Sequence, residues 1–244
     1  MEFEAWEPIY EKIREEFGFR RENDEYARDV LKKISPKSRV ESLTKFEGAK
    51  VMIAGGARCI KNELDMVEGV DKVIAVSTAA DVLLDEGVKI DMMVTDLDKN
   101  PSTSVSLSKR KIPVAIASHG DNIEYLRKWV PKCDLNYVIG TTQVEPIGNI
   151  VNCGGFTDGD RAAFLGDVLG ASEMVFVGWD FDDGSVGIEK RRKLKWAEFL
   201  LRLLEEQRGQ KFNVLEGRRD KNQFYDLIKG TYKGQEDILN NGRT

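Results

Sequence analysis

The sequence predicts an α/β fold in which helices cover both faces of a mostly parallel sheet. Short segments that are apolar throughout recur from residue 51 onward, and segments with helical periodicity separate them. Strands of this kind are buried on both faces, and their alternation with helices is typical of parallel sheets. We therefore expect a Rossmann-like domain. The expected strands are residues 51–54, 72–76, 92–95, 114–117, 136–139 and 174–178.

The chain divides into three expected parts. Residues 1–45 form an N-terminal helical segment, residues 46–230 form the Rossmann-like catalytic domain, and residues 231–244 form a polar tail. Within the domain, apolar stripes at a spacing of three to four residues predict amphipathic helices. Helices are expected at 79–86, 122–130, 160–169 and 193–207, and a late strand near 212–215 is expected at an edge of the sheet.

The N-terminal segment is expected to form two amphipathic helices. Apolar side chains such as Trp6 and Tyr10 recur at helical spacing, and Gly18 can end this first helix. Either Asn23 or Asp24 can cap a second helix. The sequence leaves open whether this segment packs on the main domain or forms a small lid over it.

Composition excludes several classes of protein. The net charge of −5 and the isoelectric point near 5.3 argue against a nucleic-acid partner. No apolar run approaches the roughly 20 residues that span a bilayer, and the N-terminus lacks the pattern of a signal peptide. We therefore expect a cytoplasmic protein without a membrane partner. Because Cys59, Cys133 and Cys153 form no C-x-x-C pair, neither a disulfide framework nor a thiolate zinc site is expected.

Carboxylates follow several of the expected strands. Asp96 and Asp98 end the third strand, and Asp121 follows the fourth. Ligands of open α/β sheets bind at the carboxyl ends of the strands, and oxygen ligands there suit Mg²⁺ and nucleotide phosphates. We expect Asp96 and Asp98 to be catalytic metal ligands, with Asp121 completing the shell. Turn and cap chemistry is the alternative for each of them.

Two neighbouring motifs carry further catalytic candidates. His119 is the single histidine and stands beside Asp121, where it could contact phosphate or accept a proton. The glycine-rich run at 154–161 contains Asp158, Asp160 and Arg161. Arg161 could hold a phosphate or a carboxylate. Asp158 could join the metal site, and Asp160 could contact the nucleotide or act as the N-cap of the following helix.

Other strand ends suggest where the substrates bind. Glycines at the end of the first strand let the backbone approach a phosphate, and the turn should open a helix. Hydroxyls after the second strand could line a nucleotide pocket or cap a helix. A basic cluster near residue 193 could neutralise phosphates. We therefore expect Gly55, Gly56, Ser77, Thr78 and Lys193 to bind the nucleotide, and Thr142, Gln143 and Asp180 to bind the second substrate.

Five runs taken together resemble one family. These are VTDLD at 94–98, HGDN at 119–122, GTTQ at 140–143, GGFTDGDR at 154–161 and KLKWA at 193–197. In this order they are similar to the archaeal 6-hydroxymethyl-7,8-dihydropterin diphosphokinases of the MptE type, over residues 50 to 205. That family resembles the catalytic domain of thiamine diphosphokinase in fold.

The resemblance implies Mg²⁺-dependent transfer of diphosphate from ATP to the pterin hydroxymethyl group, with release of AMP. The product would feed the synthesis of methanopterin or folate-type carriers. The pterin and ATP would be the partners, and a homodimer is an open option. Two positions depart from the family pattern: Lys99 stands where Gly is usual, and the turn at 55–58 reads GGAR where a Gly-Pro-Ser type loop is expected.

Two other functions stay open at this stage. A thiamine diphosphokinase would share the metal site and differ in the pocket for the acceptor. A non-enzymatic or redox Rossmann module would bind NAD or S-adenosylmethionine, and the acidic pairs would then be ordinary turns. The absence of a G-x-G-x-x-G run counts against this second alternative.

Overall fold

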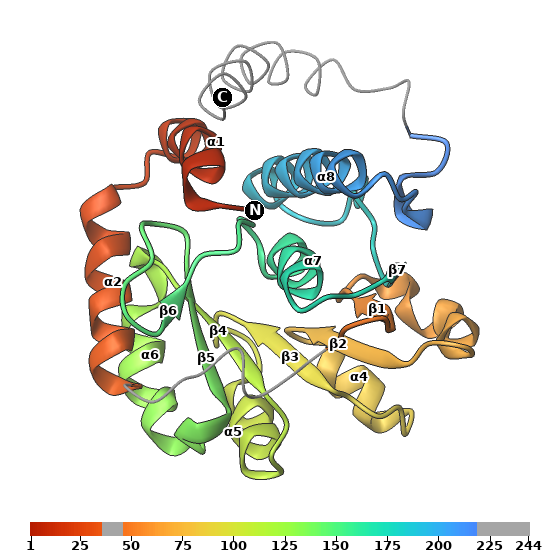
Figure 1. Cartoon of the computed structure of the whole chain (residues 1–244), viewed down its shortest axis with the longest axis horizontal. Coiled ribbons are helices and arrows are strands. Elements are labelled where there is room, and N and C mark those ends of the chain that lie inside the picture. The colour runs from red at the N-terminus through yellow and green to blue at the C-terminus, as the bar shows by residue number, and fades with distance from the viewer. Residues whose placement is uncertain (36–45, 219–244) are drawn as a thin grey trace.

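The computed structural model describes residues 1–35 and 46–218, and it confirms the α/β fold (Figure 1). Seven strands form one sheet in the order β6-β5-β4-β3-β2-β1-β7, and every strand pair is parallel. The strands are β1 (Lys50–Ala54), β2 (Lys72–Val76), β3 (Met92–Thr95), β4 (Val114–Ser118), β5 (Val138–Thr142), β6 (Ile150–Val151) and β7 (Glu173–Val177).

The strand order fixes where a ligand can bind. The chain adds β2 to β6 one after another on one side of β1, then returns to place β7 on its other side. The direction of winding therefore reverses at β1. Because all strands are parallel, their carboxyl ends meet along one edge, and the reversal opens a crevice at that edge.

Two layers of helices cover the sheet. One layer contains α1 (Phe3–Phe17), α7 (Asp158–Val168) and α8 (Ile188–Arg208), which share one apolar core with a face of the sheet. The opposite layer packs on the other face and fills a second core. Figure 1 shows the two layers above and below the strands. The second layer contains α2 (Arg21–Ile34), α4 (Ala79–Asp85), α5 (Pro101–Lys109) and α6 (Ile123–Trp129).

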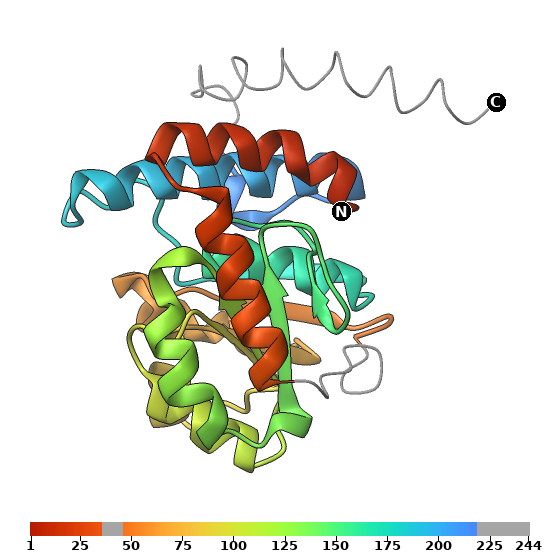
Figure 2. The ribbon, with the colours of Figure 1, turned by 90° about the vertical axis from the view of Figure 1, so that its left-hand side faces the viewer.

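The N-terminal helices are packed on the domain, which answers the question that the sequence left open. Trp6 and Tyr10 are buried in the core beneath α1, and Trp6 Nε1 donates to Gln143 O at 2.8 Å. Gly18 ends α1 with φ of 71°, as expected. Figure 2 shows α2 descending from α1 along the side of the domain.

The expected cap of α2 was wrong. The helix begins at Arg21 with Arg20 at its N-cap, so Asn23 and Asp24 lie in its first turn. Asp24 is buried, and it accepts hydrogen bonds from other elements instead of capping its own helix.

Two 3₁₀ helices lie where the sequence predicted a helix and an edge strand. The turn after β1 opens a helix, as expected, and this helix is the 3₁₀ helix η1 (Arg58–Val67). The expected edge strand near 212–215 is instead the 3₁₀ helix η5 (Asn213–Leu215). Its Asn213 side chain hydrogen-bonds both the N–H and the C=O of Phe176, at 2.9 and 2.7 Å, and so takes the place of a neighbouring strand.

Two short elements were not anticipated. Strand β6 has two residues, which is too short to give a periodic signal. Helix α5 is rich in serine and has a weak apolar stripe.

The expected tail at 231–244 lies outside the described residues. In the described part of the chain, no helix combines the length and apolarity that crossing a membrane requires.

Candidate active site

A cavity of about 930 Å³ lies at the carboxyl edge of the sheet. Strand ends, the first turns of α2 and α7, and the first half of α8 line it. All but three of the residues expected at the site lie on its wall; Thr142, Asp160 and Arg161 do not. The structure therefore brings most of the expected residues together around one cavity, and their roles stay predictions.

The Asp96-Leu97-Asp98 turn presents two carboxylates to this cavity. Leu97 has φ of 70° and its side chain is fully buried, so the backbone reverses between the two acids. Leu97 N donates to Thr95 Oγ1, and Asp98 N donates to Asp96 Oδ1, both at 3.0 Å. Asn122 Nδ2 donates to Asp96 O at 2.9 Å from the neighbouring turn. The turn thus holds both carboxylates at one place.

Asp158 joins this pair as a third negative group. Its Oδ2 accepts from Asp96 N at 3.3 Å. Burial, and then the negative charge of Asp96, raise the pKa of Asp158 to about 7, although Arg161 opposes the shift. Burial and the neighbouring Asp96 also raise the pKa of Asp98, against the ammonium group of Lys99. The cavity floor therefore concentrates more negative charge than its own cations balance.

Of the three carboxylates on the cavity floor, that of Asp96 ionises most readily. Burial alone would raise the pKa of Asp96, but hydrogen bonds from His119 and Asp98 hold it below its usual value. His119 Nε2 lies 3.6 Å from Asp96 Oδ2, and its position depends on the Asn122 side chain, which accepts from His119 N at 3.1 Å. The His119 ring therefore lies within ion-pair distance of Asp96, beside the carboxylate pair.

This donor set suits Mg²⁺ better than a cation that needs a full protein cage. Within residues 1–35 and 46–218, no three acidic, histidine or cysteine side chains already stand in a coordinating arrangement. Mg²⁺ usually takes one or two carboxylates together with waters and substrate phosphates. Asp96 and Asp98 fit that requirement, with Asp158 beside them. Asp121, the expected third ligand, lines the cavity but is exposed. Among the described residues, no hydrogen bond or ion pair joins Asp121 to Asp96 or Asp98.

The reversal point of the sheet forms a second wall. Gly55 and Gly178 end β1 and β7 and pass so closely that a Cβ on Gly55 would lie 2.5 Å from Gly178 O. A Cβ on Gly56 would lie 2.7 Å from Thr78 Oγ1. Thr78 occupies the N-cap of α4 without a capping hydrogen bond from its side chain. Ser77 lies beside it with φ of 46°. This wall offers backbone and hydroxyl groups to a phosphate.

The glycine-rich run at 154–161 forms a tightly packed loop that supports the cavity wall. Gly155 has φ of 94°, and a Cβ there would lie 2.4 Å from the Cα of Arg161. Thr157, and not Asp160, is the N-cap of α7, so that expectation was wrong. Asp160 is fully buried, and it accepts from the N–H groups of Phe156 and Thr157 at 2.5 and 2.9 Å. Both of its oxygens are used in holding the loop.

Arg161 lies under the cavity floor. Its side chain is 2% exposed, Nη1 donates to Thr142 O at 3.2 Å, and Nε has no partner among the described residues. It therefore cannot reach a phosphate in the cavity, although it faces Asp158 and Asp160 electrostatically. Thr142 is equally buried, and its Oγ1 accepts from Val144 N at 3.3 Å.

The remaining expected residues lie on the cavity wall. Gln143 is 3% exposed and comes from the end of β5. Asp180 is exposed at the far end and accepts from Asp182 N at 2.9 Å. Lys193 pairs with Glu189 at 2.8 Å, and its ammonium group lies 5.7 Å from the centre of the Phe19 ring.

Sequence reasoning missed several residues of the wall. Phe19 and Phe156 come from the loop after α1 and from the glycine-rich run, and their ring centres are 6.3 Å apart. Asp24 comes from α2 and reaches the turn after β4. Trp179 follows β7 and donates to Ile53 O at 3.0 Å. Only Phe156, inside a singled-out motif, gave a signal that could have been used.

With this geometry established, comparison with known proteins identifies the family. A family model described as 6-hydroxymethylpterin diphosphokinase MptE-like matches residues 28–185. The chain belongs to this MptE-like family. The matched range contains every carboxylate of the cavity floor and the glycine turn after β1.

Three curated relatives of this MptE-like chain carry the same name, 6-hydroxymethyl-7,8-dihydropterin pyrophosphokinase. The relative from Pyrococcus furiosus is 36% identical over 84% of this chain and 94% of its own length. The relative from Methanothermobacter thermautotrophicus is 32% identical over 84% and 96%. The relative from Methanocaldococcus jannaschii is 29% identical over 84% and 97%. The names of these relatives support a pyrophosphokinase activity.

Proposed function

We propose that this chain transfers diphosphate from ATP to 6-hydroxymethyl-7,8-dihydropterin and releases AMP, with Mg²⁺ as the cofactor. The observation that carries the proposal is the cluster of three carboxylates, from Asp96, Asp98 and Asp158, on the floor of the cavity. The chain that carries them is a member of the MptE-like family. A site with surplus negative charge needs a cation, and a phosphate-bound divalent ion supplies one. Thiamine diphosphokinase activity is the alternative within the same chemistry.

The reaction joins the pterin oxygen to the β-phosphorus of ATP. The hydroxymethyl oxygen attacks this phosphorus, the bond from the β-phosphorus to the oxygen bridging to the α-phosphorus breaks, and AMP leaves with the electron pair. The hydroxyl proton passes to a base, for which His119 and Asp121 are the candidates on the wall. Mg²⁺ held by Asp96 and Asp98 would neutralise the phosphate oxygens.

Positioning and charge carry most of the catalysis in such a transfer. The turn at Gly55 and Gly56 would let a phosphate approach the backbone N–H of Gly56, because Gly55 N and Ala57 N already donate to Val177 O and Gly178 O. Lys193 and Lys99, both on the cavity wall, would offset the charge that develops during the transfer. Arg161 would act from below the floor by stabilising the anionic form of Asp158 and would not touch the phosphates.

The nucleotide product tests this proposal. With ATP, Mg²⁺ and the pterin, we expect AMP and a pterin diphosphate in equal amounts by chromatography. Formation of ADP with a pterin monophosphate would rule out diphosphoryl transfer. Turnover of thiamine without turnover of the pterin would favour thiamine diphosphokinase activity. Omission of Mg²⁺ in the presence of a chelator is the control. The enzyme would then be a 2-amino-4-hydroxy-6-hydroxymethyldihydropteridine diphosphokinase. Its product would be used in the synthesis of methanopterin or folate-type carriers.

A further inference from the structure

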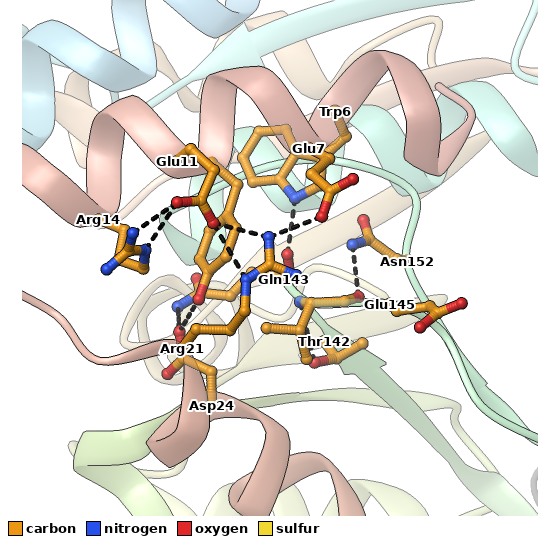
Figure 3. A network of polar contacts seen from close by, with 12 residues as sticks. Trp6, Glu7, Glu11, Arg14, Arg21, Asp24, Thr142, Gln143, Glu145 and Asn152 are labelled. Atoms are coloured by element: carbon orange, nitrogen blue, oxygen red, sulfur yellow. Dashed lines mark hydrogen bonds and ion pairs between the residues drawn. The ribbon is translucent and has the colours of Figure 1, made fainter.

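A buried carboxylate from the N-terminal segment connects α2 with two parts of the cavity wall. Figure 3 shows this residue, Asp24, beside Gln143. Asp24 is 3% exposed. Its Oδ1 accepts from Gly120 N at 2.7 Å. Its Oδ2 accepts from Tyr10 Oη at 2.8 Å and from Gln143 Nε2 at 2.7 Å. These three donors come from the turn after β4, from α1 and from the end of β5.

The contact with Asp24 sets the orientation of the Gln143 amide. An ionised carboxylate only accepts hydrogen bonds, so the amide must turn its NH₂ group toward Asp24. The backbone of Gln143 is fixed as well, because its carbonyl oxygen accepts from Trp6 Nε1 at 2.8 Å. Of the two polar atoms of the Gln143 side chain, Oε1 is the one without a hydrogen-bond partner among the described residues.

Gln143 Oε1 is available to a ligand. Gln143 lies on the cavity wall, and no donor to Oε1 is found in the described part of the chain. Oε1 is also absent from the polar atoms that are buried without a partner. The wall at the end of β5 thus presents a hydrogen-bond acceptor whose direction is decided by Asp24.

We propose that Asp24 is a positioning residue that fixes the Gln143 amide, so that Oε1 accepts a hydrogen bond from the 2-amino group of the pterin. The inference rests on the proposed function, and it adds a residue of α2 to the site residues at the strand ends. Asp24 also lines the cavity, but both of its oxygens already accept hydrogen bonds within the protein, so we assign it the orientation of Gln143 and not a contact with the substrate. The 2-amino group is a donor, and a buried acceptor that meets a donor discriminates strongly against a ring that carries an acceptor there.

Asp24→Asn tests this role because it has the shape of the natural residue. Its Oδ1 can still accept from Gly120 N, but its NH₂ group now faces Tyr10 and Gln143. Tyr10 Oη can accept from this group, and the Gln143 amide satisfies it only by turning Oε1 toward residue 24. The cavity would then receive a donor in place of the acceptor.

The measurement is the dissociation constant of two ligands by calorimetry, for wild type and variant. The ligands are 6-hydroxymethyl-7,8-dihydropterin and the matching dihydrolumazine, which carries an oxygen in place of the 2-amino group. We expect Asp24→Asn to bind the pterin about tenfold or more weakly and the lumazine more tightly, with Mg²⁺–ATP affinity unchanged. Equal losses for both rings, or a loss of ATP affinity to the same extent, would overturn the assignment.

A double variant keeps the test decisive if the single variant folds poorly. In Asp24→Asn with Gln143→Glu, the NH₂ group of residue 24 meets one carboxylate oxygen, and the other oxygen again offers an acceptor to the cavity. We expect the pterin preference to return, and failure to return in a folded protein would contradict the proposal.

Glu11→Gln is the matched control. It removes the negative charge that Glu11 presents to Arg14 and Arg21 on the same pair of helices, at a residue that does not contact Asp24, and it should leave both affinities unchanged. If it shifts the pterin preference as Asp24→Asn does, the effect comes from the helix pair and the proposal fails. If wild type binds ATP but neither ring, the proposed function itself fails, which is a different result from an unaltered Asp24→Asn variant.

Discussion

Asp158→Asn should make the metal-free protein more stable while it removes activity. Burial, and then the charge of Asp96, raise the pKa of Asp158 from 3.8 to about 7. A folded-state pKa above the unfolded value means that ionisation opposes folding. The penalty is absent below the unfolded pKa, grows as the pH rises from about 4 to 7, and is complete above the folded pKa. Asparagine does not ionise, so the variant escapes this penalty.

The size of the effect follows from the shift. About three pKa units at about 1.36 kcal/mol each give an upper limit of about 4 kcal/mol above pH 7. Asparagine keeps an oxygen for the contact with Asp96 N but removes one negative group that faces Arg161. Allowing for that loss, we expect a net gain of about 2 kcal/mol, which corresponds to a rise in Tm of about 4–8 °C for a chain of this size.

Thermal unfolding in the presence of a chelator at pH 8 and at pH 5 provides the assay. The gain in Tm should be large at pH 8 and smaller at pH 5, and turnover should fall by more than about tenfold, or about 1.4 kcal/mol in barrier. Asp121→Asn, at an exposed position on the same wall, is the control and should not change Tm. An equal gain at both pH values, or none at either, would refute the reasoning from charge.

Three further outcomes are expected. Asp96→Asn and Asp98→Asn should each lose turnover by well over about tenfold at any Mg²⁺ concentration with little change in Tm; wild-type turnover across a Mg²⁺ titration would exclude both as metal ligands. Arg161→Met should lower the free energy of unfolding by about 3–5 kcal/mol, because it leaves buried carboxylates uncompensated, and Arg161→Lys should lower it less. Unfolding in denaturant measures both variants, and equal stability of Arg161→Met and wild type would contradict this role. Asp160→Ala should lower stability by about 0.5–2 kcal/mol or more and leave the turnover of the folded fraction intact; lost turnover at an unchanged Tm would instead indicate contact with the substrates.

The glycine-rich run at 154–161 shows the limit of local patterns. Its composition indicated a functional loop, and Gly154 and Gly155 adopt positive φ. The pattern of two carboxylates and an arginine could not tell which of them faces the cavity. Asp158 does, whereas Asp160 holds the loop and Arg161 is buried below it. The direction of each side chain depends on how α7 packs against the sheet, which no spacing in the run encodes.

Local patterns in the sequence were enough to predict the α/β architecture and the edge of the sheet at which the cavity lies. Alternating apolar strands and helices predicted a parallel sheet, and parallel strands bring their carboxyl ends together, so residues such as Asp96, His119 and Gly55 had to meet. The tertiary structure alone decided which groups come from elsewhere. Asp24 reaches Gly120 across 96 positions of the chain and Gln143 across 119. Such contacts arise because α1 and α2 bury their apolar faces on the domain, and periodicity predicts that a face is buried without saying against what.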